Sequence, residues 1–401
     1  MRIVVFCHSL VSDWKNGDAH FLRGVVTELM ARGHDVEVFE PRDNWSRRQL
    51  ELEHGAEAIL AFGEAYPLLS STAYDLATLD LDAVLAGCDL VIVHEWNAPE
   101  LIARVGSHRA RSARYVLLFH DTHHRSITDP ASLSAFELRH YDGVLASGDA
   151  VAHMYVERGW SRRAWTWHEA ADVRVFYPRR SIDAVALSDD DGAEALDRPV
   201  RVRHPYDGDI VWIGNFGDEE RTVELEAFLL EPVRRLGARA AVYGVGYPDD
   251  LITKMAATGI EFRGWLANHL VPEVFAQYKV TVHIPRAPYV ASLPGIPTIR
   301  PFEAAACGIP FVSARWQDAG GLFTPGEDFL VAHDTDEMTS HLQMLLTSRP
   351  ERARLARHAF ETVQACHTCA HRVDTLLDVY HEVRDGEHRQ STMAPLLVPA
   401  S

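Results

Sequence analysis

One segment of the sequence, residues 293–313, carries residue types that suit a nucleotide ligand. It reads LPGIPTIRPFEAAACGIPFVS, which is a Pro-Gly turn, a short helical run with the single acidic residue Glu303, and an apolar strand. A carboxylate in the first turn of a helix, beside backbone N–H groups and Arg300, suits a ribose bound next to its diphosphate. The small apolar neighbours of Glu303 are atypical of a surface helix, so we predict that its carboxylate binds two vicinal ribose hydroxyls.

A second group of polar residues follows two apolar strands in the first half of the chain. His120 and Asp121 begin the polar part of the segment FHDTHHR, and His94 and Glu95 end the strand before it. We predict that these side chains point toward a cleft, and a strand-end hydrogen-bond cluster is the alternative for His94 and Glu95. The histidine spacing within one turn does not match a closed zinc site, so no metal is expected.

Apolar strands alternate with helical patterns along the chain, and these elements must position the polar residues. Strands are predicted at 3–8, 35–39, 90–94, 115–119 and 143–146, with helices at 19–32 and 98–105, and the pattern resumes at residue 209. Such alternation is typical of parallel sheets with crossover helices. Two such domains in tandem are expected to bind ligands in a cleft at the carboxyl ends of their strands.

The composition changes along the chain and predicts the domain boundaries. We expect a first doubly wound α/β domain at 1–177, a linker or excursion rich in charged and small residues at 178–208, and a second such domain at 209–384 that includes the C-terminal helices. A polar, frayed tail is expected at 385–401. Cys366 and Cys369 lack a partner pair and are interpreted as part of a packed helix face rather than a metal or redox site.

The overall composition limits the class of protein. The chain has 401 residues, 47% of them hydrophobic, and 57 acidic against 39 basic side chains give a formal charge of -18. This balance disfavours a broad nucleic-acid surface. Five scattered cysteines fit a reducing cytoplasm, and no apolar run is long enough to span a membrane. Only three of the basic residues are lysines, so a diphosphate would be held mainly by arginines or backbone amides.

The second half resembles the carboxyl-terminal domain of GT-B glycosyltransferases, and the whole chain is similar to their family-4-like, spore-maturation CgeB-like branch. The segment FEAAACGIPFVS matches the latter half of the family's pattern closely. The family has an acidic residue eight positions before the glutamate, where this chain has Gly295. We expect the backbone amides of Gly295 and Ile296 to replace the contact of that acid with the donor sugar.

Other segments extend this resemblance across the donor domain. Residues 209–217, DIVWIGNFG, look like the strand and glycine loop that open it. The resemblance implies that the diphosphate lies near Gly214, Asn215 and Arg221, with Arg286 and Arg300 as further candidates. It also implies that the nucleotide base lies near Gly264 and Trp265, although Trp265 is equally well explained as a packing residue.

In the first domain the resemblance implies the acceptor side and the catalytic groups. The turn at Asn16 and Gly17 is where GT-B enzymes admit the acceptor, and His94 and Glu95 are predicted to line the same side. Asp18 and His20 follow that turn as candidate bases, and an N-cap role is the alternative for Asp18. His120 matches the histidine beside the donor sugar in retaining members, with Asp121 as the second candidate.

The resemblance implies a metal-independent, hexosyltransferase-type glycosyltransferase without a cofactor. Its donor would be a UDP- or GDP-linked sugar and its acceptor a small molecule, a lipid-linked molecule or a polymer, with retention of configuration expected. Gly295, Asp18 and His20 leave inversion open. A nucleotide-sugar 2-epimerase on the same fold is the rival enzyme, and a nucleotide-sugar-binding protein without turnover is the rival from another class.

Overall fold

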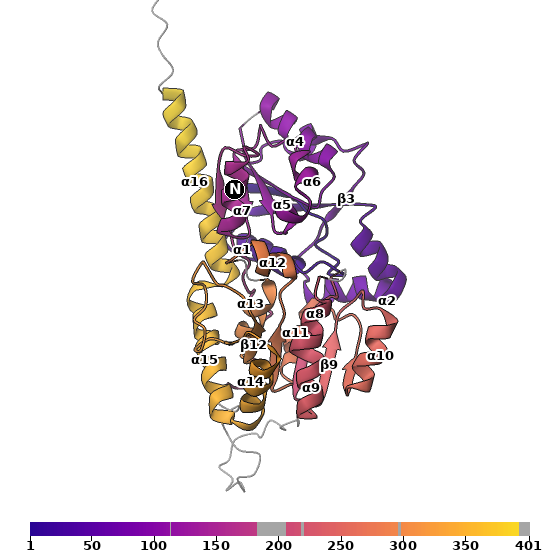
Figure 1. The fold of residues 1–401 in the computed structure, drawn as a ribbon. Coiled ribbons are helices and arrows are strands. Elements are labelled where there is room, and N and C mark those ends of the chain that lie inside the picture. The colour runs from indigo at the N-terminus through magenta and orange to yellow at the C-terminus, as the bar shows by residue number, and fades with distance from the viewer. Residues whose placement is uncertain (113, 183–205, 218–219, 296–297, 393–401) are drawn as a thin grey trace, which may run out of the picture.

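The computed structural model describes residues 1–112, 114–182, 206–217, 220–295 and 298–392, which form two α/β domains stacked on one another (Figure 1). Each domain has one parallel sheet between layers of helices. The central strands are apolar on both faces because helices cover both faces. None of the helices in the described ranges combines the length and the apolar character that a bilayer crossing needs.

The first domain has a seven-stranded parallel sheet in the order β3-β2-β1-β4-β5-β6-β7. Its strands are β1 (Arg2–Phe6), β2 (Asp35–Pro41), β3 (Thr72–Tyr74), β4 (Leu90–His94), β5 (Val116–Asp121), β6 (Gly143–Ala146) and β7 (Ala164–Thr166). Its helices are α1 (Ala19–Ala31), α2 (Trp45–Ala65), α3 (Leu81–Val84), α4 (Pro99–Ser112), α5 (Arg125–Thr128), α6 (Pro130–Ser134) and α7 (Asp149–Glu157). The order reverses between β1 and β4, which places a ligand crevice at the carboxyl ends of these two strands.

The second domain has a six-stranded parallel sheet in the order β10-β9-β8-β11-β12-β13. Its strands are β8 (Ile210–Ile213), β9 (Ala240–Tyr243), β10 (Ile260–Phe262), β11 (Val280–His283), β12 (Phe311–Ala314) and β13 (Leu330–Ala332). Its helical segments are α8 (Thr222–Leu225), η2 (Glu226–Leu230), α9 (Glu231–Leu236), α10 (Asp249–Ala257), η3 (Asn268–Leu270), α11 (Val271–Phe275), α12 (Ala287–Ser292), α13 (Ile299–Ala306), α14 (Thr335–Thr347) and α15 (Arg349–Cys366). This sheet reverses order between β8 and β11, which places a second crevice at the carboxyl ends of those two strands.

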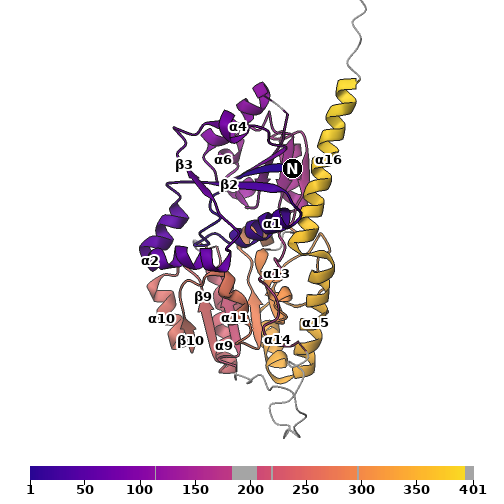
Figure 2. The same ribbon diagram turned by 180° about the vertical axis from the view of Figure 1, so that it is seen from behind.

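The last helix, α16 (Cys369–Thr392), returns to the first domain. It runs alongside that domain in both views (Figures 1 and 2). Val373, Leu376 and Val383 on α16 are fully buried in the same core cluster as Val26 and Leu29 of α1. This corrects two expectations, because the predicted second domain included all C-terminal helices and the predicted tail began at residue 385. The apolar residues of α16 extend to Val383, and residues 393–401 lie outside the described part.

Three local expectations also change. Strand β5 continues to Asp121, two residues beyond the predicted end at Phe119. Helix α13 begins at Ile299, so Glu303 is its fifth residue and no acidic residue lies in its first turn. Cys366 ends α15 and Cys369 begins α16, so the cysteines flank a break between helices rather than lying on one helix face. That break pairs with the first domain, because the Cys369 amide donates to the Ala171 carbonyl at 2.9 Å. Most of the predicted linker, residues 183–205, lies outside the described ranges.

Candidate active site in the interdomain cleft

A cleft of about 610 Å³ lies between the carboxyl ends of the two sheets. This volume is within the range of about 300–1,000 Å³ that small-molecule sites have. Loops after β1, β4, β5 and β6 form one wall, and loops after β8 and β11 with the start of α13 form the other. The predicted site residues that line it are Asn16, Gly17, Asp18, Gly214, Asn215, Arg221, Arg286 and Arg300.

The second-domain wall brings two arginines together. The buried Arg221 donates through Nη1 to the Asn215 carbonyl oxygen at 2.6 Å, which holds its guanidinium against the loop after β8. Burial, and then the charge of Arg286, lower the pKa of Arg221 to about 10, so the guanidinium stays charged at neutral pH. Arg286 forms an ion pair with Glu220 at 3.3 Å and passes Gly217, whose φ of +76° favours glycine.

Glu303 does not line this cleft. Its fully buried carboxylate contacts His20 Nδ1 of the first domain at 2.7 Å, Asn268 Nδ2 at 3.0 Å, and Arg300. Burial raises the pKa of Glu303, but Arg300 and then His20 lower it, so the net pKa is below its usual range. The Asp172 amide donates to His20 Nε2 at 2.9 Å, which places the proton of a neutral imidazole on Nδ1, facing Glu303. His20 is therefore used as a contact between the domains and does not reach the cleft.

A pair of carboxyl groups forms part of the first-domain wall. Asp18 and Glu169 both line the cleft and share a hydrogen bond. The Asp18 side chain does not cap α1, and it accepts instead from Thr122 Oγ1 at 2.8 Å. Burial, and then the neighbouring Asp18, raise the pKa of Glu169 well above its usual value. Glu169 therefore holds its carboxyl proton to a higher pH than an ordinary glutamate does.

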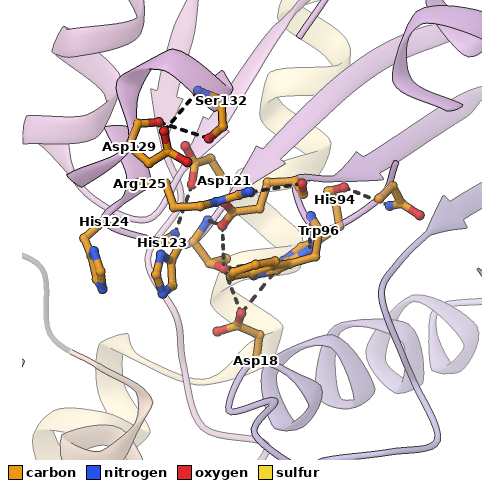
Figure 3. Close-up of polar contacts among 12 residues, drawn as sticks. Asp18, His94, Trp96, Asp121, His123, His124, Arg125, Asp129 and Ser132 are labelled. Carbon is orange, nitrogen blue, oxygen red and sulfur yellow. Dashed lines mark hydrogen bonds and ion pairs between the residues drawn. The ribbon is translucent and has the colours of Figure 1, made fainter. Parts of the chain in front are cut away.

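Glu95 lies behind this wall and holds the loop after β5 in place. Its Oε1 accepts from the Thr122 amide at 2.8 Å and its Oε2 pairs with Arg125 at 2.6 Å, and Figure 3 shows Arg125 beside Trp96. Arg125 in turn lies over the Trp96 ring at 4.2 Å. Burial raises the pKa of Glu95 and Arg125 lowers it, to a net value of about 2. Glu95 thus supports cleft residues without reaching the cleft itself.

His120, Asp121 and His94 do not line the cleft either. His94 and His120 are paired neighbours on β4 and β5, and His120 faces a small apolar void beside Phe21 and Trp167. Burial, and then His94, lower the pKa of His120 well below its usual value. Because β5 is longer than predicted, the His120 and Asp121 side chains remain inside the sheet layers. Thr122, His123 and His124, which come after the strand, line the cleft instead.

Asp121 also has an internal role. It accepts from Tyr155 Oη at 2.6 Å and from the His123 amide at 3.0 Å, and it shares a hydrogen bond with Glu95. Burial, and then Glu95, raise the pKa of Asp121 well above its usual value. The carboxyl group of Asp121 is therefore a hydrogen-bonding partner within the first domain.

Trp265 lies at a side branch of the cleft, where a loop of the first domain contacts it. Trp265 Nε1 donates to Asp13 Oδ1 at 3.1 Å, and the Asn268 amide donates to Asp13 Oδ2 at 3.0 Å. The His54 ring lies 4.6 Å from the Trp265 ring. The space left in this branch is about 50 Å³, room for a few water molecules. Gly264 lies one residue earlier and uses its carbonyl oxygen to accept from Gly244 at 2.8 Å.

Gly295 departs from its predicted role. Its amide donates to the Gln317 carbonyl oxygen at 2.8 Å, so that N–H is occupied within the second domain. Its φ of +84° explains why glycine stands there. Ile296, the other residue predicted to contact the donor sugar, lies outside the described residues.

The sequence analysis missed Glu169, Thr122 and Asp13 as members of the site. Glu169 lies three residues after the end of β7, and Thr122 follows β5 directly. A polar residue after a parallel strand is a usable signal, and Glu169 and Thr122 both carry it. Asp13 gives no such signal, because two of its partners, Trp265 and Asn268, come from the other domain.

Metal ligands do not gather at the cleft. Across the described ranges, no group of three or more His, Cys, Asp or Glu side chains is arranged to hold a metal ion. His123, which is half-buried, and the buried His124 lie next to one another there with lowered pKa values, chiefly because removal from water disfavours their charged forms.

The sequence and the fold were compared with known proteins. A family model described as glycosyl transferase-like matches residues 221–378, less than half of the chain. No curated protein sequence matches the chain.

Solved structures match both domains together. Sucrose-phosphate synthase from Thermosynechococcus elongatus superposes with a TM-score of 0.62 at 16% identity, covering 96% of this chain and 100% of that chain. HepE from Anabaena, solved with UDP-glucose, gives 0.64 at 14% identity, with 95% and 100% covered. An alpha-glucosyltransferase solved with UDP and a 13-mer DNA containing an HMU base gives 0.66 at 13% identity, with 95% and 99% covered. The two parallel-sheet domains of this chain therefore adopt the GT-B fold.

Proposed function

We propose that the protein is a metal-independent glycosyltransferase that moves a hexosyl group from a nucleotide-diphosphate donor to an acceptor on the first domain, with retention of configuration. The family-4-like, CgeB-like branch is the one we favour, on the FEAAACGIPFVS segment. The observation that carries the proposal is the pair Arg221 and Arg286 on the second-domain wall of the cleft.

Two guanidinium groups on one wall are well suited to a diphosphate. Arg221 and Arg286 lie close enough for the charge of one to lower the pKa of the other, and both line the cleft. The two arginines place positive charge on this wall, although the chain as a whole carries a formal charge of -18. An anion between the two arginines would relieve their repulsion, and the buried Arg221 Nε, which has no partner among the described residues, could donate to it.

The comparisons support this proposal from two directions. The glycosyl transferase-like family match covers residues 221–378, which is the domain that carries both arginines. HepE and the alpha-glucosyltransferase, which share the fold, were solved with UDP-glucose or UDP. A UDP-linked sugar is therefore the donor we propose first, with a GDP-linked sugar as the alternative in the same assay.

A ribose role for Glu303 requires the domains to separate. In the present arrangement the carboxylate is fully buried between His20, Asn268 and Arg300. We propose that the first domain moves away when the donor enters, so that Glu303 exchanges His20 for the ribose hydroxyls. Arg300 lines the cleft and contacts Glu303, and it would connect the ribose end of the site with the diphosphate end.

Calorimetric titration with UDP and GDP tests the donor site. We expect UDP to bind to the wild-type protein, and Arg221→Ala to weaken binding by about 1.5 to 3 kcal/mol, because a charged hydrogen-bond donor is lost. Arg221→Lys should retain part of the affinity. Arg263→Ala is the matched control, because Arg263 pairs with Glu261 on β10 and does not line the cleft. Unchanged UDP affinity in Arg221→Ala would remove the basis of the diphosphate assignment.

Product analysis tests the reaction itself. UDP-glucose and related donors are incubated with the protein with and without EDTA, and NMR of the product identifies the configuration of the new bond. Hydrolysis or transfer in the presence of EDTA is expected. A changed donor sugar without hydrolysis or transfer would indicate an epimerase, and UDP binding without any reaction would indicate a binding protein.

A further inference from the structure

Trp45 is an indole that the fold leaves open to the cleft. It begins α2 and lines the first-domain wall together with Trp14 and Trp96. The Trp45 side chain is 45% exposed, whereas most large apolar side chains of the chain are buried. An exposed indole at the mouth of a cleft is not explained by packing of the core.

The backbone at Trp45 is held in place by both of its neighbours. Asn44 and Ser46 are buried, and the Asn44 amide group donates to the His8 carbonyl oxygen. Ser46 Oγ donates to the Trp14 carbonyl oxygen at 2.5 Å and contacts Ser12 Oγ at 2.9 Å. The hydrogen bonds of its two neighbours therefore fix the backbone at Trp45 in the position that exposes its side chain.

Trp45 and Trp14 form an aromatic corner. Their ring centroids are 5.8 Å apart with the planes at 80°, and the His8 ring centroid lies 4.8 Å from that of Trp45. Trp14 Nε1 donates to Glu53 Oε2 at 2.9 Å, which fixes the orientation of its ring. The two indole planes therefore meet nearly at a right angle on the wall of the cleft.

Buried polar atoms without a protein partner lie on the same wall. Among the described residues these are His8 Nε2, His123 Nδ1 and Ser147 Oγ, and all three residues line the cleft. Burial, and then the charge of His94, lower the pKa of His8 to about 4, so its ring is neutral at physiological pH and can accept or donate there. A buried polar atom without a partner is costly, so these atoms are expected to bond with what occupies the cleft.

We propose that the acceptor is a saccharide whose ring stacks on Trp45 in the aromatic corner, which rests on the proposed transferase function. The C–H groups of a sugar face carry partial positive charge and are attracted to the negative face of an indole. The hydroxyl groups at the rim of the sugar would satisfy His8, His123 and Ser147. A saccharide is the ligand class that needs stacking faces and hydrogen-bond partners side by side.

Other occupants fit less well. A lipid chain would leave His8, His123 and Ser147 without partners. Nucleic-acid bases also stack on tryptophan, but the formal charge of -18 on the chain disfavours the polyanion that carries them. These alternatives are outcomes of the test below.

Saturation-transfer NMR on the full chain with saturating UDP measures saccharide binding directly. The panel consists of mono- and disaccharides of gluco, galacto and manno configuration, a single-stranded oligonucleotide and a short alkyl phosphate. We expect at least one saccharide to bind, and Trp45→Ala to weaken it about five- to tenfold through loss of the stacked ring. Trp45→Phe should recover most of the affinity. Leu60→Ala, an exposed position on α2 outside the cleft, is the matched control and should not change it.

Calorimetry of UDP binding on the same samples separates this inference from the proposed function. Intact UDP binding with no binding of any saccharide would overturn the saccharide assignment alone. Binding of the oligonucleotide or alkyl phosphate that is lost in Trp45→Ala would overturn it in favour of that ligand class. Saccharide binding that Trp45→Ala leaves unchanged would contradict the stacking site. Failure of UDP to bind would instead count against the transferase proposal.

Discussion

At the scale of single residues, the carboxyl pair Asp18 and Glu169 is the least expected feature of the cleft. Two carboxylates in contact repel one another, and the pair avoids this because Glu169 keeps its proton to higher pH than usual. The sequence analysis named Asp18 as a candidate base but offered no partner for it. Glu169 was missed because the two residues come from loops far apart in the chain.

We predict that Glu169→Gln flattens the dependence of stability on pH. Because the folded-state pKa of Glu169 is raised, the native protein binds more protons than the unfolded chain above the usual glutamate pKa, so stability falls as pH rises there. Glutamine cannot ionise, so the variant lacks this contribution. A difference of one between the folded and unfolded pKa of Glu169 changes the free energy of unfolding by about 1.4 kcal/mol. Scanning calorimetry at pH 5 to 8 should show that the stability of the variant, relative to that of the wild type, increases with pH. The exposed Glu57→Gln is the control, and parallel curves for wild type and Glu169→Gln would contradict the prediction.

Individual site residues could be predicted where a motif fixes their position relative to a strand. Gly214, Asn215 and Arg221 follow β8 and do line the cleft. His120 and Asp121 were misplaced because a two-residue error in the end of β5 moves a side chain from the cleft into the sheet layers. Such an error is expected, since the apolar pattern ends gradually while the hydrogen bonds of the sheet end at one residue.

At the scale of elements, α16 packs near the C-terminus of the chain against α1, the first helix. Its apolar face packs on α1, and Arg32 near the end of α1 pairs with Asp374 at 2.5 Å. Helices in the C-terminal region were predicted, because the pattern of apolar residues that indicates a helix is local in the sequence. The domain on which α16 packs was not predicted, because an apolar helix face does not specify which surface it will cover.

We predict that Leu376→Ala destabilises the protein by about 2 to 5 kcal/mol, since it leaves a cavity between α16 and α1. Leu376 is fully buried, whereas its neighbour Leu377 is only partly buried. Urea unfolding should therefore give a clearly smaller loss for Leu377→Ala. Equal losses for the two variants, or no loss for Leu376→Ala, would mean that α16 does not pack on the first domain in solution.

At the scale of the whole molecule, the two domains are held together by contacts that involve proposed nucleotide-binding residues. Asp13 of the first domain binds Trp265 Nε1 and the Asn268 amide, and His20 binds Glu303. The carboxylate of Asp13 is itself held by Arg23 at 3.1 Å. A base that binds beside Trp265 must therefore displace Asp13.

We predict that Asp13→Ala accelerates the association of UDP by about threefold or more, because a larger fraction of the protein is then open to the ligand. Stopped-flow tryptophan fluorescence would measure the rate. Asp13→Asn, which keeps an acceptor oxygen for one of the two N–H groups, should give a smaller effect, and the exposed Asp43→Ala none. An unchanged rate in Asp13→Ala would indicate that UDP enters without separation of the domains.

The sequence by itself determined the parallel α/β architecture, the presence of two domains and the resemblance of the second domain to a nucleotide-sugar-binding unit. These features depend on local periodicity and on motifs within a few residues of a strand, which short-range sequence contains. Only the tertiary structure decided that Glu303 meets His20 across 283 residues, that Asp13 meets Trp265 across 252, and that α16 covers the first domain. The reason is that each of these contacts depends on how two complete domains dock, and docking depends on surfaces assembled from distant segments.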